Sequence, residues 1–125
     1  MNLPNDIKYT KEHEWTKIEG NVATIGVTDF AQSELGDIAW IEMPELGAET
    51  KKGEPFGTIE AVKTVEDLFA PLSGKIVEIN EDLLDSPEWV NDDPYGKGWI
   101  AKIEFSDEAE LSSLLSADDY SGLIE

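Results

Sequence analysis

One lysine in the sequence has surroundings that suit chemical modification. Lys63 lies between two runs that alternate apolar and polar residues, 56–62 and 65–70, and each run is typical of a β-strand. Only Lys63 and Thr64 separate the runs, so we expect a tight hairpin that carries the lysine into solvent. The Asn-Gly and Asp-Gly pairs of mirror-image turns are missing, which favours a type I turn. An amine held there on a four-carbon stem is accessible to an enzyme that acylates it.

A lysine at a turn is more often an ordinary solvated side chain, and that interpretation has to be weighed first. Acidic Glu60, Glu66 and Asp67 surround Lys63, yet no partner at helical spacing explains its position. We therefore interpret Lys63 as the candidate functional residue.

Composition and charge exclude several classes of protein. The 125 residues contain nine lysines, no arginine and 28 acidic residues, for a net charge of −19. Such a surface repels nucleic acid and anionic membranes, and it favours partners with basic faces. Strong like charge also favours a monomer. Cysteine is absent and His13 is the single histidine, so we expect no disulfide and no metal site, and any redox chemistry must come from an attached group.

The sequence shows no catalytic machinery of its own. It has no Gly-x-Ser-x-Gly elbow and no glycine-rich phosphate loop before a helix. Paired carboxylates are expected by chance among so many acids. We therefore predict a protein that is not an enzyme.

Length and patterning predict one domain over residues 1–125. No apolar run reaches 18 residues, and residues 1–6 do not resemble a signal peptide, so we expect a cytoplasmic protein. Strands are expected at 7–10, 13–18, 22–27, 38–43, 75–79 and 99–105, in addition to the two of the hairpin. The run 38–43 is nearly all apolar, which predicts burial on both faces.

Helices are expected at the periphery of these strands. Thr28 or Asp29 can cap a short helix that ends at Gly36. One broken helical turn is expected within 80–91. The last twenty residues predict two helices, which begin at Ser106 or Asp107 and at Ser116. The fold class is therefore mainly β: a sandwich or flattened barrel with short peripheral helices and a helical C-terminus.

Several landmarks along nearly the whole chain resemble the glycine cleavage H-protein family. They are Lys8-Tyr9, His13-Glu14-Trp15, the run 22–29, Ala31-Gln32, Leu35-Gly36, Glu60, Val62-Lys63, Asp67, Ala70-Pro71, Ser73-Gly74, Pro94-Tyr95 and Gly98-Trp99. The lysine window is only moderately specific, but the landmarks before and after it make the combination specific.

The resemblance implies a lipoyl/biotinyl-type hammerhead fold, with Lys63 as the residue that carries lipoate through an amide. Glu14 and Asp67 match the family's acids that contact the loaded arm. A lipoyl ligase or transferase would recognise the residues around the lysine: Glu60, Ala61, Val62 and Thr64.

The resemblance also implies partners. The lipoyl arm would take an aminomethyl group from the P protein, a pyridoxal-phosphate glycine decarboxylase. The T protein, an aminomethyltransferase, would pass the carbon to tetrahydrofolate, and the L protein, a dihydrolipoyl dehydrogenase, would reoxidise the arm. The chain would thus be a carrier component of a multienzyme system. The absence of protein thiols agrees, because none would compete in disulfide exchange.

One departure leaves alternatives open. The family usually has Ser where this chain has Ala61, which moves the window toward that of biotin carriers. The methionines that flank the lysine in biotin carriers are replaced by Val62 and Thr64. A biotin carrier domain, an H-like protein that relays lipoyl groups, and an unmodified acidic adaptor are therefore the alternatives.

Overall fold

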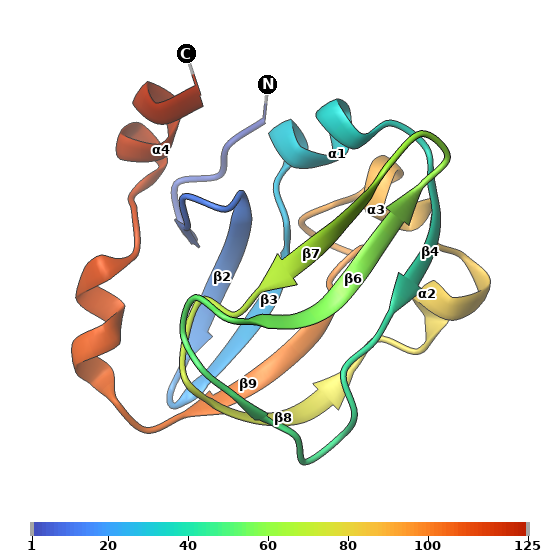
Figure 1. Ribbon diagram of the computed structural model, residues 1–125. Coiled ribbons are helices and arrows are strands. Elements are labelled where there is room, and N and C mark those ends of the chain that lie inside the picture. The colour runs from blue at the N-terminus through green and yellow to red at the C-terminus, as the bar shows by residue number, and fades with distance from the viewer. Residues whose placement is uncertain (1, 125) are drawn as a thin grey trace.

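The computed structural model describes residues 2–124, which form two β-sheets packed face to face with short helices around them (Figure 1). The larger sheet has six strands in the order β1-β2-β3-β9-β8-β5. Its strands are β1 Lys8–Tyr9, β2 Glu14–Glu19, β3 Val22–Val27, β9 Ala101–Phe105, β8 Gly74–Ile79 and β5 Glu49–Thr50. The smaller sheet has three strands in the order β4-β6-β7, with bounds Ile38–Glu42, Pro55–Ala61 and Val65–Phe69. Neither sheet closes on itself, so the fold is an open sandwich and not a closed barrel.

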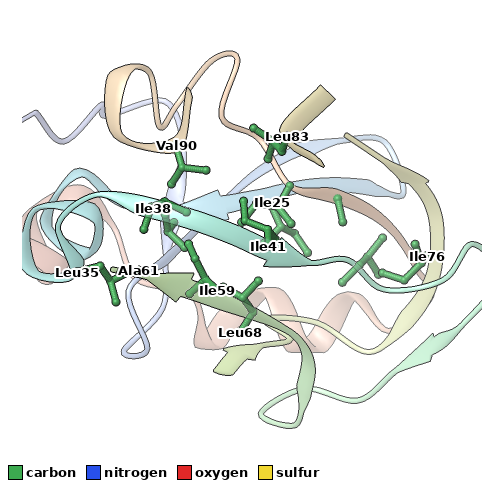
Figure 2. Close-up of a cluster of buried hydrophobic side chains, with 14 residues drawn as sticks. Ile25, Leu35, Ile38, Ile41, Ile59, Ala61, Leu68, Ile76, Leu83 and Val90 are labelled. Atoms are coloured by element: carbon green, nitrogen blue, oxygen red, sulfur yellow. The ribbon is translucent and has the colours of Figure 1, made fainter. Parts of the chain in front are cut away.

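The main core fills the space between the two sheets. Ile25 comes from the larger sheet, and Ile41, Ile59 and Leu68 come from the smaller one (Figure 2). Ile103 of β9 belongs to the same core. In β9, Ala101, Ile103 and Phe105 are buried as their alternation predicts. The two short helices α2 (Asp82–Asp85) and α3 (Trp89–Asp92) add the fully buried Leu83 and Val90 to this core.

The short helix α1 (Asp29–Leu35) has the predicted ends. The Thr28 side chain accepts a hydrogen bond from the Ala31 N–H, and Gly36 follows the last turn with φ +77°. This helix stands beside the tip of the β6–β7 hairpin in Figure 1, so its exit loop helps to position that tip.

The C-terminal segment closes the edge of the larger sheet at β1. The helix α4 (Ala117–Ile124) stacks the ring of Tyr120 on that of Tyr9, with centroids 4.8 Å apart. A bridge between Tyr9 and Leu115 adds backbone hydrogen bonds to the same contact. Within residues 2–124, no helix is long and apolar enough to cross a membrane.

Four sequence expectations need correction. The strand β4 is not buried on both faces: Ile38 and Ile41 are inward, but Trp40 is 45% exposed, because β4 is an edge strand with one face in solvent. The two-residue strand β5 was not predicted. The region 80–91 holds two helical turns instead of one. The first C-terminal helix is a 3₁₀-helix, η1 Glu108–Ser113, capped by Asp107.

Candidate functional site

The hairpin of β6 and β7 places Lys63 at its tip. Glu60 pairs with Val65, and the Ala61 N–H donates to the Thr64 carbonyl over 2.8 Å. The corner residues are therefore Val62 and Lys63, one position earlier than predicted. Within residues 2–124, His13 is the only residue other than glycine with a positive φ. Both corner residues thus have negative φ, which excludes the mirror-image turns, and the type I turn stays a prediction.

The backbone of the hairpin tip is hydrogen-bonded to the α1 exit loop, while the Lys63 amine lies in solvent beside Gly36. The Val62 N–H donates to the Asp37 carbonyl over 3.0 Å, which ties the tip to the exit of α1. A Cβ added at Gly36 would lie 3.6 Å from Lys63 Cε and 3.9 Å from Nζ, so the far end of the side chain lies beside this glycine. Among the described residues, the exposed Lys63 amine makes no hydrogen bond or ion pair. Nothing in this part of the chain competes for it.

A groove opens beside this tip, between α1, the 12–14 segment and β7. It encloses about 510 Å³. Its apolar wall consists of Val27, Phe30, Ala31, Leu35, Ile59, Leu68 and Phe69. Leu35 immediately precedes Gly36, so the groove begins where the lysine stem lies. Its polar lining is Glu12, His13, Glu14, Glu34, Glu66 and Asp67, which includes no lysine.

Glu14 is the buried acid of the groove, with 2% of its surface exposed. Its Oε1 accepts from the Thr10 hydroxyl over 3.0 Å, and its Oε2 accepts from the Phe69 N–H over 3.1 Å. Burial raises the pKa of Glu14 to about 8, although both hydrogen bonds oppose this shift. Burial thus favours the protonated carboxyl over the ionised one.

The structure also brings Asp67 to the groove, but the neighbouring Glu66 is the acidic residue of β7 whose side chain points toward the core side of the sheet. Glu66 pairs with Ile59 and Ile59 with Ile41, a row whose apolar members face the core. Asp67 pairs with Thr58, and because successive residues alternate in direction, its row faces outward. Glu66 was not among the predicted arm contacts. The alternation along 65–70 carried the signal, because it places Glu66 and Asp67 on opposite faces.

His13 is a second groove residue that was not among the predicted site residues, although it belongs to the His13-Glu14-Trp15 landmark. Its φ is +68°, its ring packs against Phe30 with centroids 4.9 Å apart, and its Nδ1 lies 2.8 Å from the Tyr120 hydroxyl. Burial lowers the pKa of His13, which favours the neutral ring. The neutral ring therefore lines the groove, and its contact with Tyr120 of α4 fixes its position. No local pattern around His13 points to a partner 107 positions away.

Three of the four residues expected to mediate recognition of the lysine reach the surface. Val62 is 81% exposed, Glu60 and Thr64 are half-buried, and Ala61 is buried. Ala61 pairs with Ile38 of β4, so its side chain belongs to the core.

Fold and site together define a lipoyl-type carrier protein: a two-sheet β-sandwich with an exposed lysine at a hairpin tip, whose amine has no polar partner among the described residues. Comparisons with known proteins identify the family within this class. The sequence pattern of the family described as "Glycine cleavage H-protein" matches residues 7–125. The chain belongs to this family.

Relatives with this family name match the chain along nearly its whole length. Two proteins called "Glycine cleavage system H protein", from Staphylococcus epidermidis strains RP62A and ATCC 12228, are 60% and 59% identical over 124 residues. In each case the match covers 99% of this chain and 98% of the relative. The crystal structure of a glycine cleavage system H protein from Mycobacterium marinum superposes with a TM-score of 0.85 at 38% identity. That match covers 95% of this chain and 96% of the other. These findings favour glycine cleavage over the biotin-carrier alternative.

Proposed function

We propose that Lys63 carries lipoate through an amide and that the protein shuttles an aminomethyl group within the glycine cleavage system. The P protein loads the arm, the T protein unloads it, and the L protein reoxidises it. The observation that carries this proposal is the free amine at a fixed hairpin tip, next to a groove with an apolar wall and acidic groups. When attached, lipoate supplies the dithiolane that accepts the cargo.

The chain's own residues suit the protection of such a cargo. The apolar wall, including Leu35 and Ile59, excludes water from a chain that lies against it. An aminomethyl group is cationic near neutral pH, and Glu14 can hold it by a charge-assisted hydrogen bond. Because an adjacent cation favours the ionised carboxyl, binding would drive the proton from Glu14. Asp67 and Glu66 add negative charge at the opening.

A first experiment tests the attachment. The wild-type protein and the Lys63→Arg variant are incubated with a lipoyl ligase, lipoate and ATP, and their intact masses are measured. We expect one lipoyl increment on the wild type and none on Lys63→Arg, whose fold is unaffected because the amine makes no hydrogen bond or ion pair. Lys52→Arg, at another exposed turn, is the matched control and keeps the increment. The assignment would be refuted if the protein isolated from its native host carried the mass of biotin, or if the wild type stayed unmodified after incubation with the ligase.

The same preparation separates glycine cleavage from lipoyl relay. Lipoylated protein is added to P protein and labelled glycine, and release of labelled carbon dioxide is followed. We expect release to depend on the lipoylated chain. A chain that accepts lipoate but supports no release would be a relay protein.

A second experiment tests the groove acids. The double variant Glu14→Gln plus Asp67→Asn is loaded with the aminomethyl group, and its spontaneous decay is timed. We expect decay about tenfold faster than wild type, the equivalent of losing one hydrogen bond to a charged group. Glu66→Gln shows which acid of β7 contributes, and Glu104→Gln, on the other sheet, is the control. Equal decay in all variants would exclude this role.

A further inference from the structure

The outer face of the smaller sheet carries two exposed apolar side chains, Trp40 and Val65, that the core does not use. In the register of the strands, Trp40 of β4 lies opposite Glu60, and Glu60 lies opposite Val65 of β7. Trp40 is 45% exposed and Val65 is 57% exposed. Neighbouring strands lie about 4.8 Å apart, so the row spans about 10 Å. We call Trp40, Glu60 and Val65 the tip row.

The tip row is continuous with the hairpin corner. Val62, at the corner, is 81% exposed and directly precedes Lys63. Among residues 2–124, three of the seven large exposed apolar side chains are thus Trp40, Val62 and Val65. Their concentration beside the lysine distinguishes this patch from the single exposed apolar residues normal on protein surfaces.

Charge around the tip row is negative. The next outward row consists of Glu42, Thr58 and Asp67, and its two acids are exposed. Glu60 lies in the middle of the tip row. A complementary surface is therefore an apolar depression that accepts an indole ring and is bordered by lysine or arginine side chains.

We propose that the tip row is the docking surface for the enzyme that acylates Lys63. This inference rests on the proposed function. Enzymes that use a loaded protein can bind the arm itself, whereas the acylating enzyme meets a bare amine. It must distinguish Lys63 from eight other lysines, including Lys51 and Lys52 in another exposed turn. The surface beside the lysine is what differs.

The chemistry at the lysine is simple once the enzyme has docked. The deprotonated Nζ attacks the carbonyl carbon of an acyl adenylate, and a C–N bond forms as the C–O bond to phosphate breaks. AMP leaves with the electron pair, and the nitrogen loses a proton. The tip row takes no part in these bonds, so Trp40 and Val65 act on recognition and not on the reacting atoms.

The test compares acylation rates of unmodified proteins at limiting lipoyl ligase, with lipoate and ATP, followed by intact mass. We expect Trp40→Thr to lower kcat/KM by about tenfold or more, mainly through KM. Val65→Thr, nearly isosteric, should lower it severalfold. Val77→Thr is the matched control, because Val77 is an exposed strand valine on the larger sheet, and its rate should equal that of wild type.

Further measurements keep the outcome clear. Circular dichroism and thermal unfolding check that each variant is folded, and if Trp40→Thr is unfolded, Val65→Thr decides alone. Each variant is then lipoylated to completion, its dithiolane is reduced chemically to the dithiol, and L protein reoxidises that dithiol, at an expected wild-type rate. Acylation of both folded variants at the wild-type rate would overturn the docking surface while leaving the proposed function intact. Failure of the wild type to be acylated at Lys63 would instead overturn the proposed function.

Discussion

Glu14 shows how a single carboxyl can be held in the interior without a cation. Its two oxygens accept from the Thr10 hydroxyl and the Phe69 N–H, bonds that favour the ionised form. Burial has the larger effect and raises its pKa to about 8. The residue therefore keeps a proton that an ordinary glutamate loses, and the groove holds less charge than its sequence indicates.

This shift predicts a pH-dependent stability. Between the ordinary pKa near 4.5 and about 8, folded Glu14 binds a proton that the unfolded chain has released. The contribution of this group to stability is therefore complete below the ordinary value and is lost as pH rises through the folded one. We expect Glu14→Gln to gain a few kcal/mol in free energy of unfolding, relative to wild type, between pH 5 and pH 9.

Urea denaturation at pH 5, 7 and 9 measures this difference. The exposed neighbour Glu12 supplies the control, and Glu12→Gln should follow the wild-type curve. A difference between Glu14→Gln and wild type that is constant with pH would show that the carboxyl is already ionised in the folded protein.

At the scale of single residues, spacing between two strands singled out Lys63 as a candidate and the family resemblance alone pointed to Glu14, but burial was not predictable. A carboxyl in a polar sequence gives no sign of interior placement, and the second hydrogen bond of Glu14 comes from Phe69, 55 positions away. The choice between Glu66 and Asp67 depends on strand pairing, which the alternation fixes only when one face is known to be inward.

At the scale of elements, local patterning predicted strands and caps well where one face alone is buried. Strand β9 and helix α1 follow their patterns closely. Strand β4 does not, because Trp40 makes an outward position look like a core position. Strand β5 has two residues, too few for any periodicity.

Two glycines test how tightly elements pack. A Cβ at Gly26 of β3 would lie 2.5 Å from Nε1 of Trp15, which donates to the Pro94 carbonyl. We expect Gly26→Ala to lower the free energy of unfolding by about 1–3 kcal/mol, since the indole must move. Gly122 in α4 has nothing within 4 Å of such a Cβ. Gly122→Ala should instead stabilise by about 0.5–1 kcal/mol.

Urea denaturation at neutral pH measures both variants. The two substitutions should change the free energy of unfolding in opposite directions, which no general effect of alanine would produce. If Gly26→Ala keeps the wild-type free energy of unfolding and the Trp15 hydrogen bond, the backbone of β2 and β3 must shift to make room for the methyl group at little cost.

At the scale of the whole molecule, the sandwich class followed from many short strands, but the assignment of each strand to one of the two sheets did not. Strand β3 pairs with β9, so Ile25 lies opposite Ala101, 76 positions later. Such pairings depend on how both sheets cover one core, and no local pattern encodes them. The acidic surface was evident from composition, whereas the placement of five of its acids along one groove required the fold.

The bond from Val62 to Asp37 has a mechanical consequence. It clamps the corner of the hairpin to the end of α1, so a substituent on Lys63 swings from a stationary pivot. Its far end can sweep only the shell that its own bonds allow. Every catalyst that works on that end must bring its reaction centre to the shell.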